Sequence, residues 1–338
     1  MTVMARTPPI GLLSTGSYLP KLEVDNEELT QRFSLDSDWI ERKTAIRTRR
    51  FAAADEAVSN LAVHAAEAAL NQAGVAAEDI AFLILSTGTG DFPAPPTSYL
   101  VQDALGAAGA VCFDLNATCA GFVYALAVAR SLVTTTPGAY ALVVASEIYS
   151  RFTDPRDRAT AVLLADGAGA AVVGAVPAGT GIIDTELRSY GNAADLIVIP
   201  GGGSRIPATV ASVTAHEHAV RMRGREVTEF VLGNVPPILE ELLARNGFSL
   251  NDVDHFIPHQ ANGVMVRELA ERAGLSRATT HLTAHCYGNS GSASLPVTLD
   301  DAHRQGAIRD GDLVLLTAFG SGMTVGACLM RWVSGPVR

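Results

Sequence analysis

The chain of 338 residues lacks both a long uninterrupted apolar run and an excess of basic side chains. A membrane-spanning helix needs about 18 or more largely apolar residues in a row, and polar or charged residues interrupt every such stretch here. The first ten residues also lack the apolar core of a signal peptide. With a net charge of -10, the chain lacks the concentrated basic face that general nucleic-acid binding requires. These absences predict a cytoplasmic protein that binds neither membranes nor nucleic acid.

Cysteine is scarce, and its spacing excludes two kinds of site. The four cysteines, Cys112, Cys119, Cys286 and Cys328, contain no CxxC pair and are too few for a disulfide-stapled domain. We therefore expect reduced thiols, most of them small core residues and one of them reactive. A hydrophobic content of 48% is enough for a large core, in two domains or in one two-lobed fold.

Short apolar runs typical of buried strands alternate with longer helical stretches. The runs lie at 82–86, 111–115, 141–146 and 169–173, and again at 256–258, 313–318 and 327–332. This alternation predicts an α/β fold. The stretch 187–225 has little periodicity and contains three consecutive glycines, so we expect it to be a long excursion that forms the wall of a pocket.

The sequence repeats itself weakly. Residues 70–87 align without a gap with residues 243–260, and each copy is typical of a helix end, a Gly C-cap, a turn and a buried strand. A second repeat pairs 140–147 with 312–319, although chance similarity of such units is the alternative explanation. Duplication predicts two similar halves, 1–176 and 177–338, that bury their sheets against shared helices in five layers, αβαβα. An active site is then expected where the halves meet.

Cys119 has the surroundings of a nucleophile. The segment 111–133 passes from a strand through a polar turn into an apolar helix, and Cys119 lies at that turn between small residues. A helix that starts there offers unpaired N–H groups and the positive end of its dipole. A free thiol has a pKa of about 8.5, and a helix N-terminus lowers it. We therefore expect a lowered pKa for Cys119 and a reactive thiolate.

Two polar residues of the second half are candidates for the same junction. His259 closes an apolar strand before the expected helix at 264–273, and Asn289 lies in a turn rich in Gly and Ser that allows close approach to a ligand. Taken alone, each is more often a structural residue. We assign only structural roles to the remaining histidines, which include His216, His218, His255, His281 and His285. Arg221, Arg223 and Arg225 form either a local basic patch or a solvated edge.

Three motifs together resemble one family. NATCAGF around Cys119, PHQAN around His259 and YGNSGSASLP around Asn289, in this order, resemble β-ketoacyl-acyl-carrier-protein synthase III of the thiolase superfamily. The resemblance extends to the segments 38–50, 57–70, 157–173 and 313–332. It implies the duplicated thiolase fold and a catalytic trio of Cys119, His259 and Asn289.

The resemblance also implies a mechanism. The Cys119 thiolate attacks an acyl-CoA, while the backbone N–H groups of Cys119 and Ser321 hold the oxyanion. A malonyl thioester then loses CO2, and the resulting enolate, stabilised by His259 and Asn289, attacks the acyl-cysteine. Neither a metal nor another cofactor is needed. The alternatives are acyl transfer to a hydroxyl, amine or carrier thiol without decarboxylation, and an inactive structural partner.

Substrate access is expected from the same resemblance. Trp39 and Arg158 match positions that hold the adenine of CoA between a ring and a guanidinium. Phe92 matches a residue that reaches across a homodimer interface into the acyl pocket of the partner. Thr228 replaces a bulky aromatic residue beside the substrate passage, which could admit a wider group.

The surface that meets an acidic carrier protein departs from the family pattern. Val264, Glu229 and Glu271 stand where basic residues are common, and only Arg272 remains of that patch. Because charge complementarity steers such encounters, the usual fatty-acid carrier protein is a doubtful partner. A different carrier protein or free CoA thioesters are better suited to this surface. A specialised role, such as the priming of a polyketide, is then expected.

Overall fold

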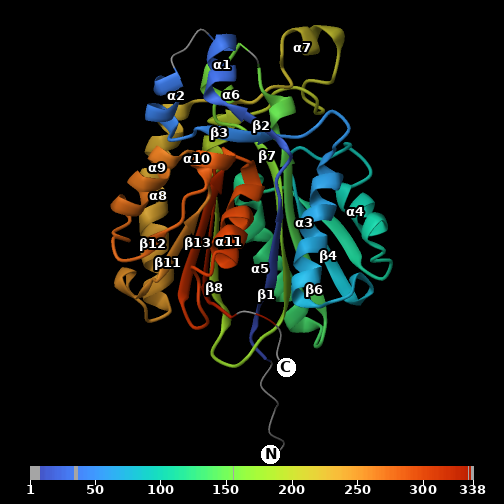
Figure 1. Ribbon diagram of the computed structural model, residues 1–338, viewed down its shortest axis with the longest axis vertical. Coiled ribbons are helices and arrows are strands. Elements are labelled where there is room, and N and C mark those ends of the chain that lie inside the picture. Colours follow the sequence, from blue (N-terminus) through green and yellow to red (C-terminus); the bar gives the residue numbers. More distant parts are fainter. Residues whose placement is uncertain (1–7, 34–36, 155, 334, 336–338) are drawn as a thin grey trace, which may run out of the picture.

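Two five-stranded sheets form the frame of the molecule (Figure 1). The computed structural model describes residues 8–33, 37–154, 156–333 and 335. The first sheet has the order β1-β7-β6-β4-β5, with β1 Ile10–Tyr18, β4 Ile80–Ser86, β5 Val111–Leu115, β6 Tyr140–Ile148 and β7 Asp166–Ala175. The second has the order β12-β11-β13-β14-β8, with β8 Gly181–Ser189, β11 His255–Pro258, β12 Thr279–Thr280, β13 Leu313–Gly320 and β14 Thr324–Arg331.

The two sheets have the same strand directions in the same order. In the first, β4 is parallel to β5 and β6, and β7 and β1 follow as antiparallel strands. In the second, β11 is parallel to β12 and β13, and β14 and β8 follow as antiparallel strands. All seven predicted apolar runs coincide with strands of these sheets. The duplicated α/β fold expected from the sequence is therefore confirmed.

Helices complete five layers (Figure 1). The central layer holds α5 Gly121–Thr135 and α11 Ser294–Arg304, and α5 packs against strands of both sheets. The first sheet is covered on its outer face by α3 Val58–Ala73 and α4 Thr97–Leu105, and the second by α8 Gly224–Arg245 and α9 Gly263–Arg272. This arrangement is the predicted αβαβα stack.

The central helix is apolar because much of it packs between the two sheets. By length and composition, one segment of the described residues, 118–135, could cross a membrane. It consists of α5 and the turn before it, and Phe122, Leu126 and Ala129 are fully buried there between the two sheets. A helix that is buried on both sides has no polar stripe. The apolar composition of this segment is thus that of a core helix.

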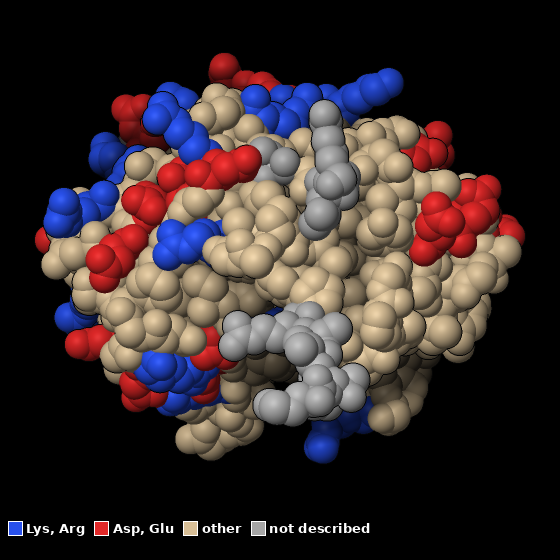
Figure 2. Space-filling view, turned by 90° about the horizontal axis from the view of Figure 1, so that it is seen from below, with Lys and Arg blue, Asp and Glu red and all other residues tan. Residues whose placement is uncertain are grey.

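Smaller elements cover one end of the stack. They are β2 Leu22–Asp25, α1 Asn26–Phe33, α2 Ser37–Thr44, β3 Thr48–Phe51, α6 Arg158–Ala161, β9 Ile197–Val198, α7 Val210–Thr214, β10 Arg221–Met222 and α10 Ala284–Tyr287. The predicted excursion starts later than expected, because β8 continues through Ser189. The opposite end, seen from below in Figure 2, carries interspersed basic and acidic side chains at its rim and a broad uncharged middle.

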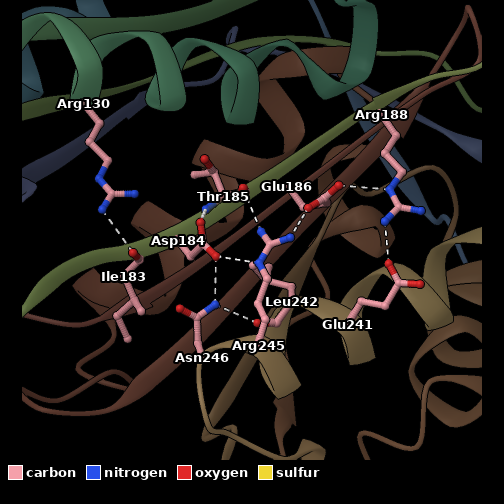
Figure 3. Close-up of polar contacts among 10 residues, drawn as sticks. All are labelled: Arg130, Ile183, Asp184, Thr185, Glu186, Arg188, Glu241, Leu242, Arg245 and Asn246. Atoms are coloured by element: carbon pink, nitrogen blue, oxygen red, sulfur yellow. Dashed lines mark hydrogen bonds and ion pairs between the residues drawn. The ribbon is translucent and has the colours of Figure 1, made fainter.

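Ion pairs hold the end of α8 against the edge strand β8 (Figure 3). Arg245 of α8 contacts Glu186 and donates to Asp184 of β8, with a distance of 2.7 Å for the latter. Arg188 of β8 reaches Glu241 of α8 at 2.5 Å. Exposed pairs of this kind each contribute only about 0.2–1 kcal/mol. Charged side chains on an edge strand also discourage pairing with other chains.

Candidate active site

A cavity of about 520 Å³ lies where the two halves meet. The first half contributes Cys119 to its lining, and the second half contributes His259, Asn289 and Ser321. Residues 197–199, from the predicted excursion, form part of its wall. The structure thus brings the catalytic trio predicted from the sequence into one cavity. Each of the three residues comes from a different loop at the end of a strand or short helix.

Cys119 lies in a tight turn between β5 and α5. The turn is a 3-10 helix, Thr118–Ala120, and α5 itself begins only at Gly121, two residues later than expected. Thr118 has a φ of 48°, a left-handed conformation that is uncommon for a residue other than glycine. Its hydroxyl donates to the carbonyl of Ser321 at 3.1 Å. The turn is therefore held in place by a residue of the second half.

The expected lowering of the Cys119 pKa is wrong. Burial, with a smaller contribution from the nearby Glu147 carboxylate, raises the pKa of the thiol to about 12. Burial destabilises the thiolate by more than the N-terminal end of the helix stabilises it. A thiol with such a raised pKa is protonated at neutral pH, so Cys119 must lose its proton when it acts as a nucleophile.

The end of β13 lies against the nucleophile. A Cβ atom at Gly320 would lie 2.7 Å from the backbone nitrogen of Cys119 and 2.5 Å from the hydroxyl of Thr118, so no side chain fits there. The next residue, Ser321, donates its hydroxyl to the carbonyl of Ile197 at 2.5 Å. Cys119 and Ser321, which carry the predicted oxyanion donors, therefore both line the cavity, and the residues next to them, Thr118 and Gly320, lie in close contact.

His259 is a buried and neutral residue. It follows β11, and its backbone N–H donates to the carbonyl of Thr317 at 2.7 Å. Its Nδ1 atom lies 2.7 Å from the Ser294 hydroxyl, which also accepts the N–H of Gln260 at 3.1 Å. Burial lowers the pKa of the ring to about 3. The imidazole is thus uncharged at physiological pH.

Asn289 is fixed by its backbone and by its side-chain oxygen. Its N–H donates to the carbonyl of Leu163 at 2.9 Å, and its carbonyl accepts the N–H of Ala165 at 2.8 Å. Its Oδ1 atom accepts the N–H of Gly291 at 3.0 Å. Because the side-chain oxygen is already engaged, the NH2 group is the part of the amide left to donate to a ligand.

The predicted access residues occupy different places. Trp39 and Thr228 line the cavity, and the Arg158 guanidinium lies 5.5 Å from the Trp39 ring centre. A flat base can stack between the Trp39 ring and the Arg158 guanidinium only if these groups lie about 7 Å apart, which is twice a van der Waals contact distance. Binding of the expected adenine would therefore require Arg158 to move. Phe92 lies outside this cavity, on the segment between β4 and α4, with 57% of its surface exposed.

The predicted arginine patch is neutralised by acidic partners. Arg221 pairs with Glu217, Arg223 with Asp195 and Glu226, and Arg225 with Glu229, at 2.8 to 3.4 Å. These arginines lie on the surface, and each faces an acid of its own neighbourhood. These pairs favour the other interpretation, that of a solvated edge, for the three arginines.

Sequence reasoning missed three residues near the nucleophile: Glu147, Tyr149 and Ser294. Glu147 is fully buried in β6, and burial raises its pKa to about 7. A single acid inside the apolar run of residues 140–148 was the available signal. Within the described ranges, no group of three or more His, Cys, Asp or Glu side chains could hold a metal ion.

Sequence comparison agrees with this geometry. Residues 113–191 match the model of the 3-oxoacyl-(acyl-carrier-protein) synthase III family, and residues 243–332 match the model of its C-terminal region. An acetoacetyl CoA synthase, NphT7 of Streptomyces sp. (strain CL190), is 45% identical over 95% of this chain and 98% of its own length. A β-ketoacyl-(acyl-carrier-protein) synthase III of Natranaerobius thermophilus is 40% identical over the same shares.

The chain belongs to the 3-oxoacyl-(acyl-carrier-protein) synthase III family. It is thus a condensing enzyme of the acyltransferase class. Solved structures of the family have the same fold. The synthase III of Pseudomonas aeruginosa, FabH, gives a TM-score of 0.88 at 34% identity, covering 98% of this chain and all of the other. The priming β-ketosynthase of the R1128 polyketide pathway gives 0.88 at 32%, covering 97% and 98%.

The close approach at Gly320 yields a test of this family site. Gly320→Ala places a methyl group against the Cys119 backbone and moves the facing N–H groups apart. We expect acylation by acyl-CoA to fall by about 100-fold or more, the loss typical of a missing oxyanion donor. Intact-protein mass spectrometry over time measures the rate. Gly109→Ala is the control, because a methyl group there meets open space. Wild-type acylation by Gly320→Ala contradicts this oxyanion geometry.

Proposed function

We propose that this enzyme takes an acyl group from acyl-CoA onto Cys119 and condenses it with malonyl-CoA, with loss of CO2. The observation that carries the proposal is the cavity shared by Cys119, His259 and Asn289, in which both polar partners are neutral hydrogen-bond donors. Similarity to an acetoacetyl CoA synthase over nearly the whole chain supports a CoA-bound product.

The first half-reaction transfers the acyl group. The sulfur of Cys119 forms a bond to the thioester carbonyl carbon, and the bond from that carbon to the CoA sulfur breaks. The proton of the Cys119 thiol ends on the CoA thiol, so charge is conserved. The N–H groups of Cys119 and Ser321 stabilise the oxyanion of the tetrahedral intermediate.

The second half-reaction makes the carbon-carbon bond. Malonyl-CoA loses CO2, and the electron pair of the broken bond becomes an enolate, whose oxygen accepts hydrogen bonds from His259 and Asn289. The Ser294 hydroxyl accepts from Gln260 and can therefore give its own proton to Nδ1 of His259. That leaves the ring proton on Nε2 as a donor. The enolate carbon then attacks the acyl-cysteine and releases the Cys119 thiolate, which is reprotonated.

The electrostatics favour condensation over simple acyl transfer. An alcohol or amine acceptor needs a general base, and such a base works best with a pKa near the operating pH. Burial lowers the pKa of His259 to about 3, so its ring is a weak base. A neutral ring remains a good donor to an enolate oxygen.

Free malonyl-CoA fits the surface better than a carrier protein does. The arginines 221, 223 and 225 are paired with acids, and Glu229 and Glu271 are exposed. Val264 is also exposed, at 39% of its surface. An acidic carrier protein would meet few cations available for steering. Condensation with a malonyl-carrier remains the second candidate.

We also propose that a second copy of the chain completes the acyl pocket. Three large side chains are exposed on one flank, Phe92 at 57%, Tyr99 at 49% and Val111 at 59%, and Val111 lies on the edge strand β5. The segment of Phe92 is fixed, because Asp91 accepts the N–H and hydroxyl of Ser59 at 2.9 and 2.6 Å. A fixed, exposed aromatic ring beside a free strand edge is suited to pairing with another copy.

The two half-reactions can be separated by mutation. His259→Ala and Asn289→Ala should still form the acyl adduct, because neither residue is assigned to acylation. Each should reduce CO2 release from malonyl-CoA by about 100-fold or more, since each removes a preorganised donor. Adduct mass and labelled CO2 are the two measurements. An equal loss of both steps would instead assign His259 as the base for Cys119.

The acceptor is identified by a direct comparison. We expect malonyl-CoA to react at least as fast as a malonyl group on the housekeeping carrier protein. The carrier rate should depend little on ionic strength, because the arginines 221, 223 and 225 are already paired with acids. Initial rates across a salt series measure both. A strong preference for the carrier that disappears at high salt would contradict the surface argument.

Dimerisation has its own test. Val111→Asp puts a charge on the exposed edge strand, and we expect it to convert a wild-type dimer into monomers with little activity. Val210→Asp is the control, because Val210 is 87% exposed on α7, far along the chain from this flank. Sedimentation velocity measures the state. A fully active wild-type monomer would disprove the proposal.

A further inference from the structure

Glu147 is a buried carboxylate that the reaction scheme leaves without a role. It is fully buried near the end of β6, and no ion pair is formed by it among the described residues. An uncompensated charge at such a place is costly unless hydrogen bonds satisfy it. The hydrogen-bond partners of Glu147 must therefore explain how a carboxylate is stable in this position.

The partners of Glu147 are all donors. Its two oxygens accept the N–H of Gly88 at 3.1 Å each, and the hydroxyl of Thr89 donates at 2.6 Å. The hydroxyl of Ser292 donates at 2.8 Å, and a longer contact of 3.4 Å comes from Thr87. Hydrogen bonds to an ionised acceptor are stronger than neutral ones. These donors thus favour the ionised side chain, against the opposing effect of burial.

These partners belong to the two halves of the molecule. Residues 87–89 follow β4 in the first half and lead to the segment that carries Phe92. Ser292 lies three residues after Asn289, in the turn of the second half. A Cβ atom at Gly291, within that turn, would lie 3.2 Å from Cγ of Glu147. The carboxylate side chain therefore supports the turn at close range.

Glu147 lies close to the turn of the nucleophile. A Cβ atom at Gly121, two residues after Cys119, would lie 3.8 Å from Cβ of Ser292, whose hydroxyl donates to Glu147. The negative charge of Glu147 raises the pKa of Cys119, after the larger effect of burial, and it raises that of Tyr149 in the same way. The other titratable groups on this cavity are Lys43, Tyr149 and His259. Tyr149 and His259 are both neutral at pH 7, because burial moves their pKa values far from it. The pKa of Glu147, about 7, lies within the working range of pH.

We propose that Glu147 is a positioning residue, which holds the turn of Asn289 against the segment after β4 and sets the field at Cys119. Its geometric part rests on the proposed condensation, since the positioned turn serves the enolate. Its electrostatic part is independent of that reaction, because it concerns the thiol alone. A purely structural buried acid would affect stability without moving the thiol titration.

Two variants separate the geometric and electrostatic parts. Glu147→Gln keeps the shape and removes the charge, and Ser292→Ala removes one contact to the turn and keeps the charge. Glu78→Gln is the control, because Glu78 is an exposed acid in the turn before β4. For each, we measure CO2 release from malonyl-CoA, acyl-adduct formation, and the pH midpoint of Cys119 alkylation by iodoacetamide.

We expect Glu147→Gln to lower the rate of condensation by about 10-fold or more, because the turn of Asn289 is no longer held in position. The rate of acylation should stay nearly the same. The alkylation midpoint should fall by about half a pH unit or more, because a like charge is removed. Ser292→Ala should lower condensation by about 5-fold, the effect of one lost hydrogen bond, with an unchanged midpoint. Glu78→Gln should match the wild type in all three.

The outcomes distinguish this proposal from the proposed function. If the wild type releases no CO2 from malonyl thioesters, the condensation scheme fails, and the alkylation midpoint still tests Glu147. If Glu147→Gln leaves both the midpoint and condensation unchanged, the positioning role is overturned. If Glu147→Gln does not fold, Ser292→Ala decides: wild-type condensation in that variant overturns the role in holding the turn.

Discussion

The two halves of this enzyme approach each other so closely at Cys119 that one position admits only glycine. A Cβ atom at Gly320 would lie 2.7 Å from the backbone nitrogen of the nucleophile. This contact depends on α5, which packs between the sheets and presents its N-terminal turn to the end of β13. Protein interiors tolerate little change in volume, so the position of the nucleophile is set by the whole stack. The functional residues of a pocket at this junction therefore come from both copies of the duplicated unit.

Burial controls the protonation of three groups at or near the cavity, Cys119, His259 and Glu147. It keeps the Cys119 thiol protonated and the His259 ring neutral, and it raises the pKa of the Glu147 carboxyl group to about 7. Neutral donors inside a site of low polarity interact strongly with a developing negative charge. The same environment disfavours a free thiolate. The site is therefore suited to charge that appears only during the reaction, on an oxyanion or an enolate.

Local patterns predicted the strands and the catalytic trio, while features that depend on tertiary contacts were missed. The strand runs and the motifs around Cys119, His259 and Asn289 are encoded within a few residues each, and all fall where expected. Strands β1 and β8 carry polar or charged residues along their length, so their apolar pattern is weak. The acidic partners of the three arginines lie mostly three or four residues away, so the sequence already contained that signal. The raised pKa of the Cys119 thiol arises instead from burial and from Glu147, which is distant in the sequence. No local motif carries that information.

The central claim is that one cavity performs both acyl capture and decarboxylative condensation, and a single-turnover experiment tests it most directly. The enzyme is loaded with labelled acyl-CoA, freed of CoA, and then given malonyl-CoA, with adduct mass, peptide position and CO2 followed together. We predict one acyl group on Cys119 alone, consumed in step with an equal amount of CO2 and 3-oxoacyl-CoA. An adduct on another cysteine, or an adduct that leaves Cys119 without CO2 release, would contradict the account.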